Sequence, residues 1–517
     1  MIKQLFTFLL FAAIWVNPLQ AQIDGDNIFG SEQIITIDLD FSQTGFWDSL
    51  VLNYDSETYM KADLTLTDAS GVSTFTDIGI RLKGNSSYGH PGNKKSFKID
   101  FNKYVTGQNY DGLKKLNFSN AFKDPSLMRE KLFFDVCREA NVLAPRASFA
   151  NVYFNETLWG FYTVVEQIDD QFLDWAILDD DGNLFKAGAN FGGGPGGSGN
   201  AADLKYYGDD QADYEERYEL KTNEDDNNWS DLIALTDFID NSSAADFESG
   251  LADQIELEEY LRSAALDNLF SNLDSYTESA RNYYIYHNLT TSKWEWIKWD
   301  GNEAFGSYAP GLGDVTTLAL DFHGDDRPLL ENIFDSPQLY GQYQTQLCDL
   351  TEQFFNTDYM NPKIDAMKTL IQSSVYADGN KMYTDANFDD NIENDISTGG
   401  GPGGGNIYGL KSFVQERSDF VANQLDCTTA VDLVDAGTTS SFPNPFNSTV
   451  LVNWEKEQFN SLKVYNSLGA EVYQATVKNT NSIELDLSFL NSGTYFLRLF
   501  SEDRAIASSG VIGLVKI

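Results

Sequence analysis

Apolar and polar residues alternate with period two through the first third of the chain, which predicts β-strands. The alternating runs cover residues 36–41, 62–66, 78–83 and 94–101, and two more flank a turn at 155–157 within 146–165. A loop rich in Gly, Asn, Ser and Pro separates the third run from the fourth. The N-terminal part is therefore expected to be rich in β-structure.

Helical periodicity follows in two places. One helix is predicted from Asp124 as N-cap and Pro125 as first residue, with apolar residues repeating on one face from Met128 to Cys137. The other helix runs through 261–269. Alternating runs on either side of Thr290 and Thr291 then predict an antiparallel hairpin over 281–300. The main part of the chain is thus expected to be an α+β domain.

The two ends of the chain have patterns of their own. Residues 1–21 carry a positive charge at Lys3, then an apolar run, and end at a small residue, Ala21. This pattern predicts a cleaved secretory signal. No later stretch approaches the ~20 apolar residues that a membrane-spanning helix needs. In residues 438–517, apolar and polar residues alternate in short runs that are separated by turns with Gly, Asn and Ser. This pattern predicts a small β-sandwich. The main domain is then expected at 22–430.

Composition narrows the function. The 517 residues include 35 Lys and Arg against 78 Asp and Glu, a formal net charge of −43. This charge disfavours nucleic acid and anionic membranes as partners and favours cations. With three Cys and three His, catalysis is expected to depend on Asp. Acidic runs at 179–181 and 389–390 are candidate structural Ca²⁺ sites, with solvated turns as the commoner interpretation. Cys348 and Cys427 could pair in an oxidising compartment.

Two glycine-rich runs, at 191–199 and 399–405, interrupt the main domain. Neither run follows a strand and opens a helix with a Lys, so neither is a phosphate-binding loop of that type. We interpret both as flexible loops.

Lysines near the fourth alternating run form a candidate phosphate site. The loop before it presents backbone N–H groups and hydroxyls such as that of Ser86, and Lys95 or Lys94 can place an ammonium group beneath it. Glu166 is a hypothetical carboxylate partner of this lysine. A plain hairpin with surface lysines explains the same residues. Further lysines inside apolar runs, which favour pairing with an anion, are Lys186 and Lys221.

Three oxygen-bearing side chains converge at the open end of the predicted 281–300 hairpin. Folding the hairpin sets Asn282 roughly opposite Asp300, and Asp274 arrives at the same end from the preceding helix. An Asp, an Asn, a hairpin and another Asp are arranged in this way around the base and the magnesium ligands of protein kinases. Mg²⁺ needs few protein oxygens, because phosphate and water complete its shell. The alternative interpretation is a hairpin with capping polar residues.

The C-terminal segment resembles a known sorting domain. PNPF at 443–446, KVYNSLGAEVY at 463–473 and LDLSFLNSGTYFLRL at 485–499 follow one another in register. They resemble the type A C-terminal sorting domain of the Bacteroidetes type IX secretion system. The resemblance implies that the type IX machinery carries the protein across the outer membrane, for release or surface attachment. An ordinary carbohydrate-binding sandwich is the alternative.

The main domain is similar to the CotH (spore coat protein H) kinase family. The motifs that carry this similarity, in order, are GIRLKGNSS at 79–87, KKSFKIDF at 94–101, NLFK at 183–186, YELK at 218–221, NLD at 272–274, RNYYIY at 281–286 and WIKWD at 296–300. The resemblance implies an atypical protein-kinase-like core. It also implies phosphorylation of extracytoplasmic protein, chiefly on Ser or Thr, with ATP and Mg²⁺ or Mn²⁺.

The resemblance assigns roles to residues of this chain. Asp274 would be the catalytic carboxylate, Asp300 the main metal ligand and Asn282 an accessory ligand. Lys95 or Lys94 would contact phosphate, with Glu166 positioning the lysine. The remaining residues implied at the ATP site are Arg81, Ser86, Lys186 and Lys221.

One position departs from the family pattern. The family usually has a second Asp two residues after the WD pair, and this chain has Asn302 there. Asn302 keeps an oxygen and loses a charge, so metal affinity is expected to fall unless Glu303 compensates. Two alternatives to a protein kinase therefore stay open: a catalytically silent surface adhesin or scaffold, and a kinase of surface sugar hydroxyls.

Overall fold

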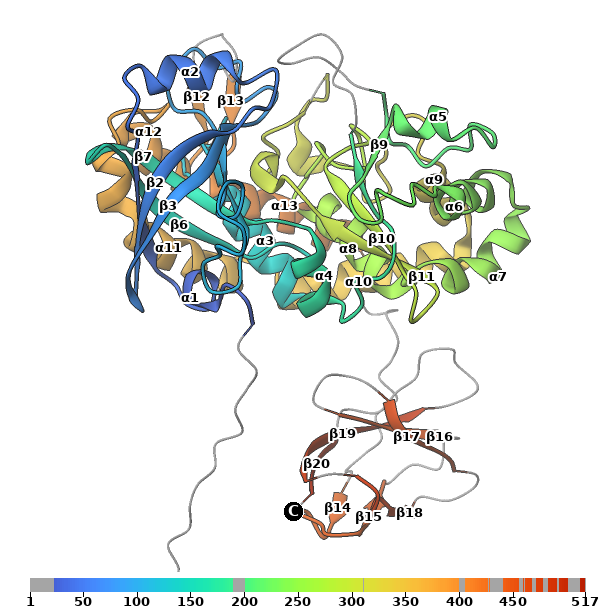
Figure 1. Cartoon of the computed structure of the whole chain (residues 1–517). Coiled ribbons are helices and arrows are strands. Elements are labelled where there is room, and N and C mark those ends of the chain that lie inside the picture. The colour runs from blue at the N-terminus through green and yellow to red at the C-terminus, as the bar shows by residue number, and fades with distance from the viewer. Residues whose placement is uncertain are drawn as a thin grey trace, which may run out of the picture. The chain divides into compact units, whose positions relative to one another are not determined.

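The structure is a computed structural model that describes residues 23–188, 200–309, 311–398, 405–425 and 427, and in the C-terminal part 440–454, 459, 461–466, 471–477, 482–490, 492–500 and 512–516. It divides into two compact units, Met1–Val421 and Ala422–Ile517, which are described in turn (Figure 1). The expected secretory signal at 1–21 and the glycine-rich run at 191–199 lie outside the described residues, and so does the run at 399–405 except for Gly405.

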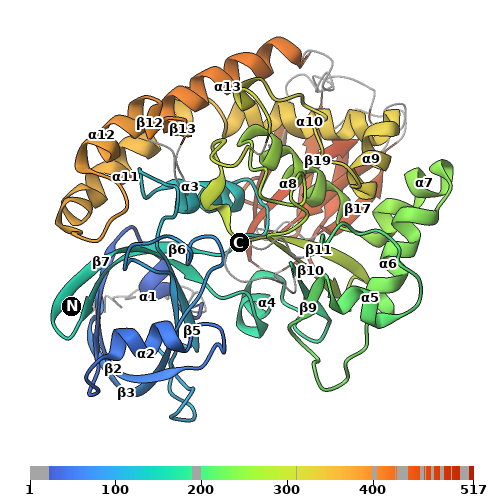
Figure 2. The ribbon, with the colours of Figure 1, turned by 90° about the horizontal axis from the view of Figure 1, so that it is seen from above.

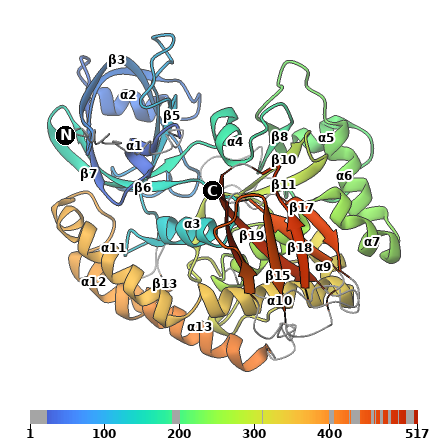
Figure 3. The same cartoon turned by 90° about the horizontal axis from the view of Figure 1, so that it is seen from below.

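The N-terminal part of the first unit is a closed β-barrel, in the strand order β1-β2-β3-β4-β5-β7-β6. The strands are β1 Ile34–Asp40, β2 Met60–Asp68, β3 Gly71–Leu82, β4 Phe97–Asp100, β5 Lys115–Ser119, β6 Ala147–Phe154 and β7 Thr157–Glu166. β1 pairs antiparallel with β2 and parallel with β6, which closes the ring. Figures 2 and 3 show this ring end-on, together with helices α1 (Asp26–Phe29) and α2 (Phe46–Leu52).

Alternating apolar residues fill the interior of the barrel, as the period-two pattern predicts. Buried members of this core include Ile35, Ile37 and Leu39 of β1, Ile78, Ile80 and Leu82 of β3, and Phe97 and Ile99 of β4. Because successive side chains of a strand point to opposite faces, Arg81 and Lys98 lie on the outer face of the barrel. The strand pattern thus determines which charged residues can reach the rest of the domain.

A second sheet, in the order β11-β10-β8-β9, follows the barrel. Its strands are β8 Leu184–Ala187, β9 Tyr218–Leu220, β10 Tyr283–Asn288 and β11 Lys293–Lys298. The predicted hairpin is confirmed as β10 and β11, in which Tyr283 pairs with Lys298 and Asn288 with Lys293. The surrounding helices are α4 Asp170–Ala176, α5 Gln211–Glu215, α6 Ser230–Asn241, α7 Ala244–Gln254, α8 Leu257–Leu269, α9 Pro328–Asp335 and α10 Pro337–Gln353 (Figure 2). The helix predicted over 261–269 is part of α8.

Helix α3 (Arg129–Glu139) begins later than the sequence predicts. The prediction that Asp124 is its N-cap is wrong. The Asp124 carboxylate forms a buried ion pair with Arg129 and accepts a hydrogen bond from the Ser126 N–H at 2.9 Å. Arg129 is fully buried and needs this partner, because an unpaired charge in the interior is costly. The predicted apolar face is correct, since Met128, Leu132 and the residues that follow on this face are buried.

The remaining elements of the first unit are η1 Gly301–Glu303, η2 Val315–Thr317, α11 Thr357–Ala377, α12 Asp385–Glu393, β12 Ile396–Thr398, β13 Gly405–Ile407 and α13 Leu410–Gln424. Within the described ranges, no helix combines the length and the apolar character that crossing a membrane requires. Cys137 of α3 is free and buried, whereas Cys348 and Cys427 are both disulfide-bonded.

The C-terminal unit consists of two antiparallel sheets, in the orders β14-β15-β18 and β17-β16-β19-β20. The strands are β14 Ser440–Phe442, β15 Thr449–Asn453, β16 Ser461–Tyr465, β17 Glu471–Thr476, β18 Ser482–Asp486, β19 Gly493–Phe500 and β20 Ile512–Lys516. Val450 and Leu485 of the first sheet share one hydrophobic core with Leu462 and Leu497 of the second. The chain as a whole is thus mixed α+β, with a β-rich N-terminal part, helices in the middle and β-sheets at the C-terminus.

Candidate functional site

The β10–β11 hairpin brings Asp274, Asn282 and Asp300 to its open end. Asn282 precedes β10, and Asp300 follows β11 after Trp299. The Asn282 side-chain amide donates to the backbone oxygen of Asp274 at 2.8 Å and to its carboxylate at 3.0 Å. Asn282 has a φ of 60°, a left-handed conformation that Asn tolerates better than most residues. The loop thus holds the Asp274 carboxylate in a fixed orientation.

Asp300 presents a carboxylate to the same space. It is half-buried, and among the described residues its side chain has no hydrogen-bond partner. Burial raises the pKa of Asp300 to about 6, the Asp274 carboxylate adds to the rise, and Lys83 opposes it. Two neighbouring carboxylates that repel each other in a partly buried site favour a bound cation.

Lys83 lies at the end of β3, directly after Leu82, and faces these carboxylates. Its ammonium group donates to the Asn117 side-chain oxygen at 3.2 Å and lies 5.3 Å from the centre of the Trp299 ring. Burial lowers the pKa of Lys83 to about 8, whereas Asp300 and Glu130 act in the opposite direction. The lysine therefore lies where an anionic ligand would gain most from its charge.

Glu130 of α3 is the second acidic group that acts electrostatically on this lysine. It is buried, and its Oε2 atom has no hydrogen-bond partner. Burial raises the pKa of Glu130 to about 8, with a further rise from Asp300, while Lys83 lowers it. A buried carboxylate and a lysine on a facing strand form the pair that anchors ATP phosphates in protein kinases.

The sequence interpretation missed Lys83 and Glu130. Lys83 alternates with the buried Ile80 and Leu82, which indicates that it leaves the barrel on the opposite face. Glu130 is an acidic residue inside an apolar stretch before Leu132. Both signals are local, yet only the fold shows that β3 and α3 bring the two side chains together.

The lysines that the sequence predicts at the phosphate have other partners. Lys94 is fully buried and pairs with Asp378 at 2.7 Å. Lys95 donates to the backbone oxygens of Tyr88, at 2.6 Å, and His90. The hypothesis that Glu166 pairs with a strand lysine is wrong, because its carboxylate accepts from the Arg146 Nε at 3.0 Å. Glu166 lies at the barrel end of β7, where the buried Arg146 is the nearer cation.

Of the remaining residues predicted at the ATP site, Arg81 and Lys186 act electrostatically on Lys83. Arg81 lies two residues before it on the same face and pairs with the exposed Glu57 at 3.0 Å. Ser86 is exposed in the loop after β3. Lys186 of β8 acts electrostatically on both Lys83 and Asp300, and its ammonium lies 3.7 Å from Glu219. Lys221 pairs with the same carboxylate at 3.3 Å.

Asn302 and Glu303 tie the loop after Asp300 to the segment before α3. The Asn302 amide donates to the Phe122 backbone oxygen at 3.3 Å, and Glu303 pairs with Lys123 at 3.0 Å. Burial raises the pKa of Glu303 to about 8, and Asp274 adds to the rise. Asn302 therefore donates a hydrogen bond that an ionised Asp in its place could not donate.

A divalent cation would be held mainly by Asp300 in this arrangement. Its carboxylate has no other partner, and the neighbouring Asp274 and Asn282 provide oxygens, the ligand type of Mg²⁺. Across the described residues, no cluster of three or more His, Cys, Asp or Glu suited to a metal ion occurs. At the two acidic runs, Asp179 accepts from the Thr290 hydroxyl at 2.6 Å, and Asp389 pairs with Lys368 at 3.3 Å.

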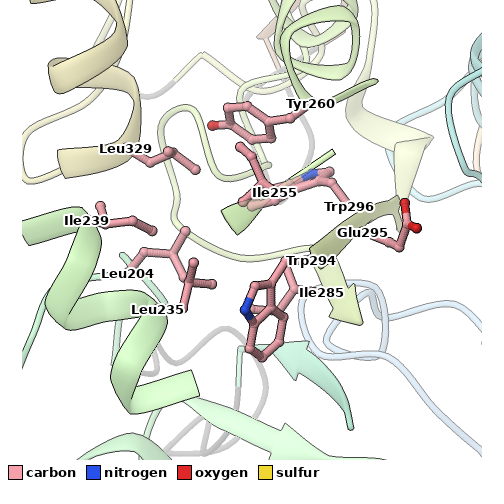
Figure 4. A pocket seen from close by; sticks show the side chains of 10 residues that line it. All are labelled: Leu204, Leu235, Ile239, Ile255, Tyr260, Ile285, Trp294, Glu295, Trp296 and Leu329. Atoms are coloured by element: carbon pink, nitrogen blue, oxygen red, sulfur yellow. The ribbon is translucent and has the colours of Figure 1, made fainter. Parts of the chain in front are cut away.

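An apolar cavity lies apart from these charged residues, between the second sheet and helices α6, α8 and α9 (Figure 4). The residues that line it are Leu204, Leu235, Ile239, Ile255, Tyr260, Ile285, Trp294, Glu295, Trp296 and Leu329. None of these ten is a residue predicted to act on ATP or metal. The cavity is therefore not the site that the charged residues indicate.

Glu259 of α8 should make stability depend on pH. Burial raises the pKa of Glu259 to about 8, the Leu143 N–H opposes this rise, and Glu295 adds to it. The folded protein then holds a proton that the unfolded chain releases near its ordinary pKa of 4.5. The stabilising contribution is present below that value and is lost as pH rises through about 8.

We therefore expect Glu259→Gln to be as stable as the wild type near pH 5 and more stable near pH 8, because Gln is neutral at both values. Gln keeps an oxygen for the Leu143 N–H, which Glu259 accepts at 3.0 Å. Urea denaturation at the two pH values measures the difference. The control is Glu258→Gln, which changes an exposed residue of the same helix. An equal pH dependence in wild type and Glu259→Gln would contradict the assignment.

Two curated relatives match this chain over more than half of its length. Inner spore coat protein H of Bacillus subtilis (strain 168) is 30% identical over 320 residues, which cover 60% of this chain and 82% of that protein. Invasin CotH2 of Rhizopus delemar is 20% identical over 391 residues, which cover 71% of this chain and 63% of that protein. The chain thus spans less than two thirds of the fungal relative. A crystal structure of the proinflammatory kinase CtkA from Helicobacter pylori matches 63% of this chain and 93% of its own, at 9% identity and a TM-score of 0.24.

Two family models match the chain. Residues 440–512 match a secretion system C-terminal sorting domain, as their sequence motifs predict, so the protein is secreted or displayed at the cell surface. Residues 80–420 match the CotH kinase protein family, and kinase activity implies ATP as a substrate. This match covers more than half of the chain and contains the end of β3, the barrel strands β4 to β7, α3 and the β10–β11 hairpin. The chain therefore belongs to the CotH kinase family.

Proposed function

We propose that this protein is an exported atypical protein kinase, which transfers the γ-phosphate of ATP to Ser or Thr of an extracytoplasmic protein. The observation that carries the proposal is the electrostatic interaction of Asp300 with Lys83, Glu130 and Asp274. Family membership supports it, because the matched region contains all four residues. We further propose that the barrel and the helical part form a protein-kinase-like core.

Each group has a role in this proposal. Lys83 contacts the ATP phosphates, and Glu130 orients the lysine. Asp300 binds a divalent cation, Mg²⁺ or Mn²⁺, with Asn282 and Asn302 as accessory oxygens. When bound, this cation neutralises charge on the phosphates. Lys83 and Glu130 replace Lys94, Lys95 and Glu166 as the phosphate-binding pair, because those three are engaged elsewhere.

Asp274 acts on the acceptor. The acceptor oxygen forms a bond to the γ-phosphorus while the bond between that phosphorus and the bridging oxygen of ADP breaks. The hydroxyl proton passes to an Asp274 oxygen. The Asn282 amide, 3.0 Å from that carboxylate, keeps Asp274 oriented toward the acceptor.

A catalytically silent surface adhesin is the second candidate. The observation that favours it is Asn302, which lacks a charge and donates its amide to Phe122. The fungal relative is named an invasin, which is compatible with a surface role. A kinase that phosphorylates sugar hydroxyls is the third candidate and needs the same groups around ATP.

One labelling experiment separates the three candidates. The purified full chain is incubated with ATP labelled at the γ-phosphate and Mg²⁺ or Mn²⁺, together with extracytoplasmic protein or surface polysaccharide. Label on Ser or Thr supports the proposed function. Label on sugar supports the sugar kinase, and absence of label on protein and sugar with both metals supports the silent adhesin.

A further inference from the structure

A buried ion pair joins helix α8 to the end of β11. The Lys298 ammonium lies 2.5 Å from one oxygen of the Asp267 carboxylate, and the two side chains are 3% and 5% exposed. The ammonium also donates to the Ser263 backbone oxygen at 3.0 Å, so a second bond holds it against the same helix. Apolar residues of similar size are often as stabilising as a buried ion pair, so stability alone does not explain this one.

The other oxygen of the Asp267 carboxylate holds a different segment. It accepts a hydrogen bond from the Asn272 side-chain amide at 2.8 Å, and the backbone oxygen of Asp267 accepts from the Asn272 N–H at 2.8 Å. Asn272 is buried, and its Oδ1 atom has no hydrogen-bond partner among the described residues. The Asn272 side chain is therefore held through its amide, by Asp267.

These two contacts lie next to the two carboxylates of the candidate site. Lys298 precedes Asp300 by two residues, and Asn272 precedes Asp274 by two. Two residues of extended chain span at most ~7 Å, so each contact fixes the backbone close to its carboxylate. We call Lys298 the metal arm of Asp267 and Asn272 its base arm.

Asp274 and Asp300 need such a framework, because like charges repel. Asp274 acts electrostatically on Asp300 in the structure. This repulsion favours separation of the two carboxylates until a cation binds. A backbone hydrogen bond from the Phe305 N–H to the Phe270 oxygen, at 2.8 Å, also joins the two loops. The loops should therefore stay attached when one arm of Asp267 is removed.

We propose that Asp267 is a positioning residue, which holds Asp274 and Asp300 at the separation that phosphoryl transfer needs. The inference rests on the proposed function, in which these two carboxylates are the base and the metal ligand. Asp267 acts through its two arms and needs no contact with ATP or acceptor. Because a displacement of ~1 Å can lower a rate about 10²-fold, a small shift of either carboxylate is enough to slow transfer.

Two variants remove one arm each. Asn272→Ala removes the base arm and keeps the ion pair. Asp267→Asn combined with Lys298→Met removes the metal arm, leaves neither charge of the pair and keeps an oxygen for the Asn272 amide. Transfer of labelled γ-phosphate and calorimetric ATP affinity in Mg²⁺ are measured for each variant in the full chain.

The two variants should lose different quantities. We expect Asn272→Ala to transfer phosphate at least ~10-fold more slowly, with an ATP affinity within ~2-fold of the wild type, because the base acts only in the transition state. We expect the metal-arm variant to bind ATP at least ~5-fold more weakly in Mg²⁺, because Asp300 is displaced from the cation. A general loss of stability would not divide rate from affinity in this way.

Asn288→Ala is the matched control. Asn288 is also buried, and its amide donates to a carboxylate, that of Glu295, at 3.1 Å. It is the last residue of β10, at the opposite end of the strand from Asn282. We expect this variant to unfold at a lower temperature and to transfer phosphate at the wild-type rate.

If Asn272→Ala transfers phosphate as fast as the wild type, the inference is overturned and the kinase function stands. The same conclusion follows if both arm variants lose rate and affinity by equal factors, or if Asn288→Ala is slowed as much as Asn272→Ala. If the wild type transfers no phosphate to protein, the proposed function fails and this inference fails with it.

Discussion

Replacing Asp274 by Asn is expected to lower phosphoryl transfer about 10²- to 10⁴-fold while ATP binding stays close to that of the wild type. The reason is that, in the proposed mechanism, Asp274 takes up the acceptor proton, whereas Asp300 and Lys83 bind the nucleotide. Asn has nearly the same size, and its side chain cannot take up the proton. Transfer rates with labelled ATP and calorimetric ATP affinities measure the two effects separately.

The control for this prediction is Asp253→Asn, which changes an exposed carboxylate of α7. It should alter neither rate nor affinity. If Asp274→Asn keeps more than about a tenth of the wild-type rate, Asp274 is not the base, because general base catalysis contributes at least ~10²-fold. If it loses ATP binding instead, Asp274 acts as a ligand of the metal.

Replacing Lys94 by Met is expected to lower the free energy of unfolding by about 3–5 kcal/mol. The Lys94 ammonium lies 2.7 Å from the Asp378 carboxylate, and the side chains are 1% and 0% exposed. Removing the lysine leaves Asp378 as a buried charge without its cation. The carboxylate would keep its hydrogen bond from the Phe161 N–H at 3.0 Å, which cannot neutralise it.

Urea denaturation of both proteins gives this difference. Lys61→Met is the matched control, because Lys61 pairs with Asp77 at 3.0 Å with side chains that are 52% and 50% exposed. Exposed pairs contribute about 0–1 kcal/mol, so the control should change little. If Lys94→Met lowers the free energy of unfolding by less than about 1 kcal/mol, the buried pair between Lys94 and Asp378 does not stabilise the fold as predicted.

Local patterns predicted the elements of the chain well. Period-two alternation identifies β1, β2, β3 and the β10–β11 hairpin, because a strand shows its two faces in its own residues. The closure of the barrel could not be predicted, since the parallel pairing of β1 with β6 joins segments far apart in the sequence. The α3 boundary was wrong because the buried Arg129 takes Asp124 as its partner.

The carboxylate side of the candidate site was easier to predict than its lysine side. Asp274, Asn282 and Asp300 all belong to one hairpin and its approach, so folding that hairpin places them. Lys94 and Lys83 both lie near apolar strand residues, so the local sequence does not distinguish a structural lysine from a phosphate-binding one. Their roles depend on Asp378, directly after α11, and on Glu130 of α3, and the sequence assigns neither residue to either lysine.

Calorimetric titration with ATP tests the central claim most directly. The full chain and its Asp300→Ala variant are each titrated in the presence of Mg²⁺ and again with a chelator in place of the metal. The account predicts ATP binding that needs the metal and is lost in Asp300→Ala, whose thermal midpoint ATP should then fail to raise. Binding by Asp300→Ala as tight as by the wild type, or no binding by the wild type with Mg²⁺ or Mn²⁺, would contradict a kinase site at Asp300.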